Sequence, residues 1–285
     1  MYELLAQKII VTHISPDFDG ILAIWLLKKF HPDFADARVE LVPAGNNTYN
    51  KEPVDSNPDV VHVDVGGGRF DHHDTVEFTC AAKLVYDYLI REDYIDKEDE
   101  ALKRLIDVTV ELDHGWDSYR WPDPASDRWE FSLHNVLSGI KMQYRGDFNK
   151  AIEWTIDSLE AVYKLLKSKV AAEKEIKEGI IYKTRWGKGI AVYTKNDAIM
   201  DLAIKTGYAL VVRKDPVEGY VRITGSNKHK VDFTKAYEMI SKKDNIGNWF
   251  LHSSKVLLRN GSTRNPTMKP TKMTMEEVIE ILERS

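Results

Sequence analysis

The sequence predicts an α/β protein in two parts: an N-terminal domain built on a parallel sheet and a smaller α+β domain, joined by a long helix. Short β-branched runs alternate with apolar helical segments over residues 8–90, which is typical of βαβ units. A helical pattern without proline or glycine covers residues 147–178. Short strand-like runs and one amphipathic helix follow it. We therefore expect an α/β domain at 1–146, a connector helix at 147–178 and an α+β domain at 179–285.

The N-terminal elements follow from the lengths and periods of the apolar runs. Strands are expected at residues 8–12, 38–42 and 60–65. Helices are expected at residues 21–30, 81–90 and 98–112. The first of these helices is apolar at nearly every turn, so we expect it to be buried against the sheet. A segment rich in aromatic residues, proline and aspartate is expected to form a loop at residues 116–127.

The C-terminal domain is predicted from shorter signals. Strands are expected at residues 180–183, 189–193, 209–213, 220–224, 249–251 and 256–258, and a closing helix at 275–282. The connector that precedes them would be about 48 Å long if it is one continuous helix that rises about 1.5 Å per residue. A helix of this length is a natural link between two domains.

The composition excludes several classes of protein. With 285 residues, 43% of them hydrophobic and 30% charged, the chain can bury one large core or two smaller ones, which excludes disorder of the whole chain. No apolar run approaches the roughly 18 to 20 residues of a membrane span, and the first residues lack a secretory signal pattern. The one cysteine, Cys80, cannot form an intrachain disulfide or a thiolate zinc cluster. We therefore expect a cytoplasmic protein without a membrane segment, whose metal ions are held by histidine and carboxylate groups.

Charge is unevenly distributed along the chain, whose formal net charge is −5. Residues 1–178 carry 21 Lys and Arg against 34 Asp and Glu, a net charge of −13. Residues 179–285 carry 19 against 11, a net charge of +8. A basic domain can bind an anionic ligand while an acidic one holds cations. Attraction between two oppositely charged domains explains the same pattern, and the sequence leaves both explanations open.

The first motif with a chemical meaning is the turn HISPDFD (residues 13–19), between the first expected strand and the first expected helix. It places an imidazole and two carboxylates at the carboxyl end of a strand, where open α/β sheets bind their ligands. A helix cap explains Asp19, and Pro16 and Asp17 favour a turn. These structural roles account neither for His13 nor for the second carboxylate.

Three further motifs follow along the same domain. Asp64 closes the third expected strand before three glycines (66–68), and a carboxylate there is costly unless a cation, a metal or the amides of the turn stabilise it. The motif DHHD (71–74) holds adjacent histidines, which point in opposite directions in an extended segment, so only one can bind a given ion. The motif DHG (113–115) ends the third helix and is equally well explained as a helix C-cap.

Together the four motifs resemble the DHH phosphoesterase superfamily, whose metal-binding domain carries a His-x-x-x-Asp-x-Asp turn, an aspartate at a strand end, an Asp-His-His motif and a later aspartate. The run VDVGGGRFDHHD (63–74), the helix ending in LDHG (112–115) and the long connector are similar to the MYG1-like branch of that superfamily. The resemblance covers essentially the whole chain, strongly over residues 8–115 and loosely after residue 180. The family's GGGH motif is absent from the second domain, and LRNGSTR (258–264) stands in the corresponding region.

The resemblance implies a role for each residue of the motifs. One divalent ion would be held by His13, Asp17 and Asp64, and a second by Asp19, Asp64, His72 and Asp113, with Asp64 bridging. Mixed imidazole and carboxylate donors favour Mn²⁺, with Mg²⁺ as the alternative. Asp71 would orient the neighbouring imidazole, and His73 would contact the substrate phosphate. Asp64, Asp71 and His73 are thus expected to act in catalysis.

These observations predict a metal-dependent phosphoesterase that hydrolyses a phosphodiester by a two-metal mechanism. The expected substrate is RNA, a short oligonucleotide or a small nucleotide, because two ions about 3.5–4 Å apart stabilise an in-line displacement at phosphorus. The alternative is a metal-binding regulatory or nucleotide-binding protein of the same fold without turnover, which the missing GGGH motif favours. The sequence leaves the oligomeric state open.

The basic domain supplies the expected substrate-binding residues. These are Arg259, Gly261, Ser262 and Arg264, with His73 from the first domain. Arginine presents forked donors that match a phosphate, so this segment is expected to hold the phosphate-bearing substrate, including single-stranded RNA. An ordinary basic loop explains the same residues equally well.

Overall fold

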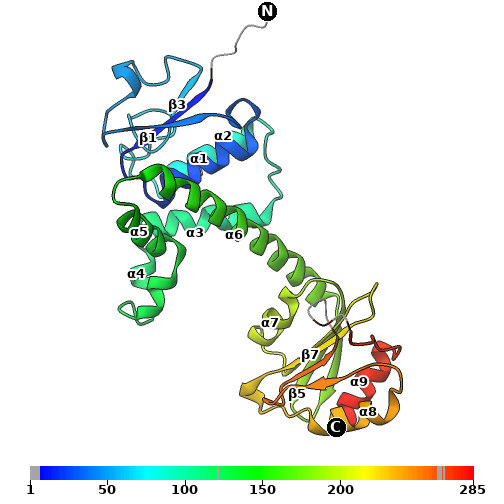
Figure 1. Cartoon of the computed structure of the whole chain (residues 1–285). Coiled ribbons are helices and arrows are strands. Elements are labelled where there is room, and N and C mark those ends of the chain that lie inside the picture. Colours follow the sequence, from blue (N-terminus) through cyan, green and yellow to red (C-terminus); the bar gives the residue numbers. More distant parts are fainter. Residues whose placement is uncertain (1–6, 121, 262–264, 266) are drawn as a thin grey trace, which may run out of the picture. The chain divides into compact units, whose positions relative to one another are not determined.

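The computed structural model describes residues 7–120, 122–261, 265 and 267–285, and the chain divides into two compact units (Figure 1). Unit 1 is Met1–Leu166 and unit 2 is Lys167–Ser285. The division falls inside helix α6 (Phe148–Lys177), where the connector helix was expected. Among the described helices, none combines the length and the apolar character that a membrane span requires. The predicted fold class is confirmed: an N-terminal parallel sheet, a long helix and a second, mixed sheet with helices.

The sheet of unit 1 has three parallel strands in the order β2-β1-β3. These are β1 (Ile9–His13), β2 (Arg38–Val42) and β3 (Val60–His62). The middle strand is buried from Ile9 to Thr12, as expected for a strand covered on both faces. Because the strands run the same way, the residues that follow β1 and β3 lie at one edge of the sheet. The functional motifs of the sequence lie at this edge.

Several helices accompany the sheet of unit 1. They are α1 (Phe18–Phe30), α2 (Ala81–Arg91), α3 (Glu100–Asp113), α4 (Asp117–Arg120) and α5 (Leu133–Tyr144), with short 3₁₀ turns at Pro32–Phe34, Tyr49–Lys51 and Asp127–Phe131. The first helix is the core of the unit, since every residue from Asp19 to Leu27 is buried. It packs against α2 and α3. The rings of Trp25, Phe30 and Tyr163 meet edge to face and fix α6 against it.

Unit 2 is a six-stranded mixed sheet in the order β4-β5-β6-β7-β9-β8. Its strands are β4 (Ile180–Thr184), β5 (Gly187–Tyr193), β6 (Leu210–Lys214), β7 (Val221–Gly225), β8 (Phe250–Leu251) and β9 (Leu257–Asn260). Only β5 and β6 pair in parallel. A 3₁₀ turn lies at Asn227–His229.

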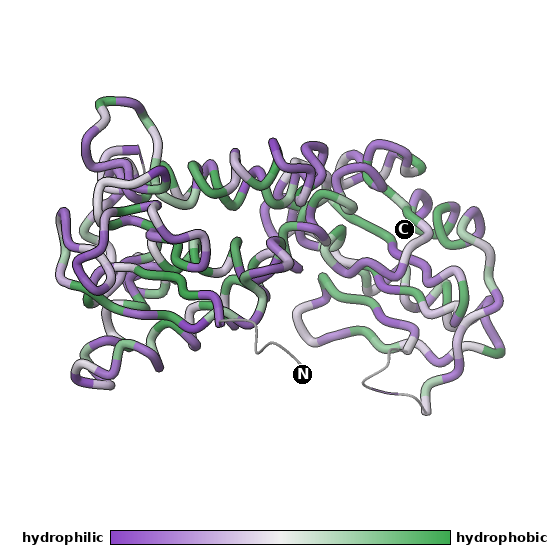
Figure 2. Tube along the Cα trace, turned by 90° about the horizontal axis from the view of Figure 1, so that it is seen from above, coloured by the Kyte–Doolittle hydropathy of each residue, from purple (hydrophilic) through white to green (hydrophobic). Residues whose placement is uncertain are grey.

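Helices lie on both faces of this second sheet. They are α7 (Ala198–Lys205), α8 (Thr234–Lys243) and α9 (Met275–Arg284). Ile190 and Val211 pack with α7 and the end of α6, whereas Leu210 and Ile223 pack with α8 and α9 on the other face. Figure 2 shows hydrophobic residues along the strands of each unit. Burial alternates along β7 with the period of two of a strand, so one face of this strand is packed in the core while Arg222 and Thr224 lie on the other, partly open face.

The structure differs from the sequence prediction at two kinds of place. The third strand ends at His62 rather than at residue 65, because Asp64 takes a left-handed backbone conformation with φ 58° and turns the chain out of the ladder. Helices α5, α7 and α8 were not anticipated, and the expected loop at 116–127 contains the short helix α4. Short helices depend on packing against the rest of the unit rather than on their own propensity.

Candidate metal centre

The turn after β1 brings His13 and Asp17 to the edge of the parallel sheet. The Nδ1 atom of His13 lies 3.0 Å from the carbonyl oxygen of Ile14, which leaves Nε2 to face the interior of the site. Asp17 caps helix α1, because its Oδ1 accepts a hydrogen bond from the amide of Gly20 at 3.1 Å. The cap expected at Asp19 is therefore wrong. Asp19 lies inside the first turn and is buried.

Asp64 is the central carboxylate of the site. The amide of its neighbour Val63 still donates to the carbonyl oxygen of Val11 in β1, at 2.9 Å. Asp64 itself has a left-handed backbone conformation, which turns the chain across the edge of the sheet. The side chain is almost fully buried, with 3% exposure. Oδ2 lies 3.3 Å from Nε2 of His13, and Oδ1 lies 3.4 Å from Nε2 of His72. Each oxygen of one carboxylate thus faces a different imidazole, which is the arrangement that a bridging ligand requires.

Gly20 makes room for this carboxylate. A Cβ atom at residue 20 would lie 3.0 Å from Oδ2 of Asp64 and 3.2 Å from Oγ1 of Thr12. The hydroxyl of Thr12 is buried and has no hydrogen-bond partner among the described residues. A buried polar atom without a partner is costly and usually indicates a group that completes the site.

His72 joins the carboxylates from three elements. Its Nε2 lies 3.7 Å from Oδ2 of Asp19, and its Nδ1 lies 3.8 Å from Oδ2 of Asp113, the last residue of α3. The oxygens of Asp19 also accept hydrogen bonds from the amides of Ala81 and Ala82, at 2.7 and 2.8 Å. These amides begin helix α2, where the helix dipole stabilises a negative charge.

His73 lies beside His72 but has other partners. Its Nδ1 lies 2.6 Å from Oδ1 of Asp71, and the other oxygen of Asp71 accepts from the amide of Gly67 at 2.7 Å. The imidazole is 64% exposed, and its Nδ1 is 3.9 Å from Oδ1 of Asp64. Asp71 therefore fixes the orientation of His73 and leaves Nε2 directed away from Asp71.

The pKa values of the cluster reflect its excess of buried carboxylates. Burial, together with the charge of Asp64, raises the pKa of Asp19 to about 7. Burial alone would raise the pKa of Asp64, but hydrogen bonds from His13 and His72 hold it below its usual value. The hydrogen bond to Asp64 raises the pKa of His72 to about 9 and also raises that of His13. Burial raises the pKa of Asp113. The site thus stabilises positive charge at its centre.

The donor atoms fit divalent metal ions. Three groups of side chains have ligand atoms within 4.8 Å of one another: His13, Asp17 and Asp64; Asp19, His72 and Asp113; and Asp64, His72 and His73. All six metal ligands expected from the sequence are in these groups. His73 is an additional member. The mixture of imidazole nitrogens and carboxylate oxygens suits a borderline or hard divalent cation.

The expected substrate-binding residues of unit 2 are only partly described. Ser262 and Arg264 lie outside the described residues. Gly261 has φ 74°, and a Cβ atom at this position would lie 2.5 Å from the ring of Tyr220. The backbone conformation and the close approach of this ring therefore explain why a glycine stands here. Arg259 lies on β9, where its Nη1 donates to Oγ1 of Thr224 at 3.4 Å.

The register of the second sheet adds two arginines that the sequence analysis missed. Arg222 pairs directly with Arg213 on one side and with Arg259 on the other. Asp197 forms ion pairs with Arg213 at 3.2 Å and with Arg222 at 2.6 Å, whereas Arg259 has no carboxylate within 4 Å among the described residues. Burial and the neighbouring Arg222 lower the pKa of Arg259. Like charges opposite one another destabilise a sheet, so this arginine row is well placed to receive an anion. Only the strand pairing could have revealed it.

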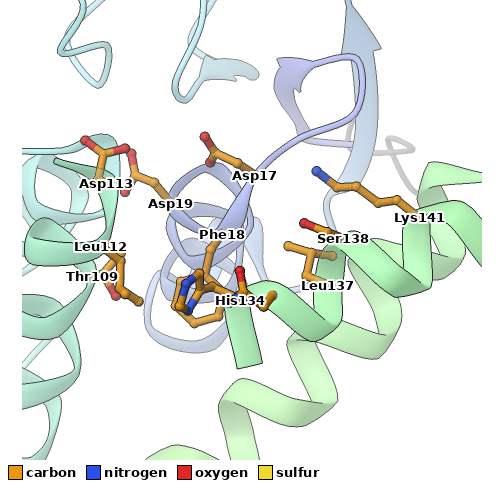
Figure 3. Close-up of a pocket in the computed structure, with 11 residues that line it drawn as sticks. Asp17, Phe18, Asp19, Thr109, Leu112, Asp113, His134, Leu137, Ser138 and Lys141 are labelled. Atoms are coloured by element: carbon orange, nitrogen blue, oxygen red, sulfur yellow. The ribbon is translucent and has the colours of Figure 1, made fainter. Parts of the chain in front are cut away.

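Helix α5 contributes a further set of residues beside the metal cluster. His134, Asn135, Ser138 and Lys141 line a cavity of about 250 Å³ together with Asp17, Asp19 and Asp113 (Figure 3). Positions 134, 138 and 141 recur at helical spacing. This spacing is the signal that a sequence reading could have used, had the helix itself been recognised.

The fold and the cluster define a two-unit α/β protein with a histidine and aspartate site at the edge of a parallel sheet. No protein-family model and no curated protein sequence matches the chain. Among solved structures, an exopolyphosphatase-related protein from Bacteroides fragilis is similar to it, with 13% sequence identity and a TM-score of 0.27. The match covers 99% of this chain and 92% of that chain.

Proposed function

We propose that the chain is a metal-dependent phosphoesterase that hydrolyses a phosphodiester with two divalent ions. The observation that carries the proposal is the position of Asp64, whose two oxygens face His13 and His72 within overlapping groups of ligand atoms. Two such ions would acidify a bridging water and stabilise the attacking and leaving oxygens at phosphorus. The mixed donors favour Mn²⁺, with Mg²⁺ as the alternative. The sequence motifs shared with DHH phosphoesterases support the same conclusion.

The proposal assigns a separate role to each residue of the site. His13, Asp17 and Asp64 would hold one ion, and Asp19, Asp64, His72 and Asp113 would hold the other. Asp71 keeps a proton on Nδ1 of His73 through their 2.6 Å hydrogen bond, so that Nε2 can contact a phosphate oxygen. The 64% exposure of His73 leaves it accessible to a substrate.

The proposed substrate is a phosphodiester in RNA, in a short oligonucleotide or in a small nucleotide. The net charge of +8 on residues 179–285 and the arginine row of Arg213, Arg222 and Arg259 support a phosphate-bearing ligand. We assign substrate binding to Arg259, Gly261, Ser262 and Arg264.

We also propose that the protein acts in the cytoplasm, because its single cysteine is buried and free.

A hydrolysis screen tests the proposal. The purified protein is incubated with Mn²⁺ or Mg²⁺ and with RNA, a dinucleotide, a cyclic dinucleotide and pyrophosphate, and Asp64→Asn serves as the matched inactive control. We expect release of phosphate monoesters from a diester, dependent on metal and on Asp64. Binding of two metals without turnover of any diester would instead support the regulatory alternative.

A further inference from the structure

The cavity beside the metal cluster has two chemically different walls (Figure 3). One wall carries Asp17, Asp19 and Asp113, which belong to the metal cluster. The opposite wall is the polar side of α5, where Lys141 directs its ammonium group toward the side of Asp17. Phe18, Leu112 and Leu137 add apolar side chains to the lining of the cavity.

Lys141 is unusual because it is half-buried without an ion pair. Its Nζ donates one hydrogen bond, to the carbonyl oxygen of Ser15 at 3.1 Å, and no carboxylate of the described residues lies within 4 Å of it. Burial lowers its pKa, although the charge of Asp17 opposes this effect. An ammonium group has three donors, so two remain free toward the cavity. A half-buried cation with free donors beside a metal cluster is suited to an oxygen of a phosphate group.

The rest of the α5 wall offers neutral polar groups. Asn135 uses its amide nitrogen on the carbonyl of Trp129 at 2.9 Å, which leaves its carbonyl oxygen free. The hydroxyl of Ser138, at the exposed rim, has no hydrogen-bond partner among the described residues. His134 lies 3.3 Å from Asp117, which holds its ring in place. Neutral donors and acceptors in a cavity that also has apolar lining suit a sugar ring.

The size and charge of the cavity restrict the ligand further. At about 250 Å³ the cavity is smaller than the roughly 300–1,000 Å³ typical of pockets for drug-sized ligands, so it holds one compact group. A chain of phosphates would need several cations, but Lys141 is the one lysine or arginine among the lining residues. The walls therefore fit a single phosphate that carries a sugar.

We propose that the α5 wall is the subsite for a sugar phosphate ester: Lys141 binds an oxygen of the reacting phosphate, and Asn135 and Ser138 bind the attached sugar. This inference rests on the proposed function, since it takes the phosphate to be held at the metal cluster. It selects nucleotide-type esters over inorganic polyphosphate as the substrate class.

Binding measurements test this subsite without requiring turnover. The full chain, loaded with Mn²⁺, is titrated with inorganic phosphate and with ribose 5-phosphate by isothermal titration calorimetry. Lys141→Met should weaken the binding of both probes roughly 10-fold or more, because a charge-assisted hydrogen bond is lost. Lys141→Arg should recover part of that loss. Ser138→Ala should weaken ribose 5-phosphate by roughly 5-fold and leave inorganic phosphate unchanged.

Controls separate the subsite from a structural role and from the proposed function. Lys150→Met, on the exposed start of α6, should leave both affinities at the parental values. If Lys141→Met instead lowers the Mn²⁺ content, the lysine only holds the Ser15 turn and the inference is wrong. If the parental protein binds two Mn²⁺ but Lys141→Met binds phosphate normally, the inference fails and the proposed function stands. If the parental protein binds no Mn²⁺, the proposed function itself fails.

Discussion

The Nε2 atom of His72 lies 3.4 Å from Oδ1 of Asp64, at the centre of the carboxylate cluster. The next residue, His73, is 3.9 Å from the same oxygen, and its closest carboxylate is Asp71, at 2.6 Å. The side chain of His72 is 16% exposed and that of His73 is 64% exposed. Two adjacent imidazoles therefore meet different surroundings, one interior and acidic, the other facing solvent.

This difference predicts different losses for the two alanine variants. His72→Ala should lose at least one of the two metals, because the ring contacts carboxylates of both ligand groups. His73→Ala should retain both metals and lose turnover by roughly 100-fold or more, as expected when a group that contacts the reacting phosphate is removed. Metal analysis after gel filtration, combined with diester hydrolysis, distinguishes the variants. Equal metal loss in the two variants would show that His73 is a ligand rather than a substrate contact.

Asp64→Asn should abolish activity and lower the metal content by both ions. An amide has no charge and only one acceptor oxygen, so it cannot serve His13 and His72 on opposite sides or bridge two cations. The stability of the metal-free protein should change less than its activity, because an asparagine preserves the volume of the side chain. Metal titration and thermal unfolding of the metal-free form measure the two effects. A variant with two bound metals and parental hydrolysis would place the site elsewhere.

The chain order of elements and most of the cluster could be predicted from the sequence for a physical reason. Parallel strands end at one edge of the sheet, so polar residues that follow strands meet there whatever the details of packing. That rule brought His13, Asp17 and Asp64 together correctly. The rule could not predict that Asp17 caps α1 or that β3 ends at His62. Both features depend on local backbone angles, which the spacing of apolar residues in the sequence does not reveal.

The features that the sequence did not reveal depend on contacts between distant segments. The arginine row exists only because β6, β7 and β9 pair in one register, and a shift by one residue would send Arg222 to the opposite face. Helix α5 was missed because half-buried polar residues interrupt its apolar pattern. The same polar residues line the cavity. They weaken the helical pattern in the sequence because they face a candidate ligand site rather than the core.

Metal affinity should rise with pH. The pKa of His72 is raised to about 9 in the metal-free protein, so this ring carries a proton at pH 7 that a metal ion must displace. Asp19, with a pKa of about 7, contributes a further fraction of a proton. Calorimetry in buffers of different ionisation enthalpy should therefore show net proton release at pH 7. The affinity for Mn²⁺ should increase between pH 6 and 8 by roughly tenfold per unit for each proton displaced.

The same pKa shifts predict the opposite trend for the stability of the metal-free protein. A histidine with a raised pKa stabilises the folded state below its unfolded pKa, about 6.5, and this contribution is lost as pH rises through about 9. The melting temperature of the metal-free protein should therefore fall between pH 7 and 9.5. His72→Ala should remove most of this slope, and an unchanged slope in that variant would contradict the assigned cause.

The last prediction concerns the arginine row of unit 2. If Arg222 and Arg259 each neutralise one phosphate of a single-stranded nucleic acid, log K should fall with log[salt] by about 0.7 for each contact. The double variant Arg222→Gln/Arg259→Gln should therefore flatten the slope by up to roughly 1.4 units, with unchanged metal content. Oligonucleotide binding by fluorescence anisotropy over a salt series measures this slope.

A stability measurement and a control variant on the surface complete the test. Arg259→Gln alone should not lower the melting temperature, because Arg259 faces Arg222 across the strands and has no carboxylate partner among the described residues. Lys205→Gln, an exposed change on α7 where the lysine pairs with Asp201, removes one charge and should leave the salt slope at the parental value. A double variant with the parental slope would show that these arginines do not contact the nucleic acid. In that case a small phosphoester, bound entirely within unit 1 beside Lys141, becomes the preferred substrate.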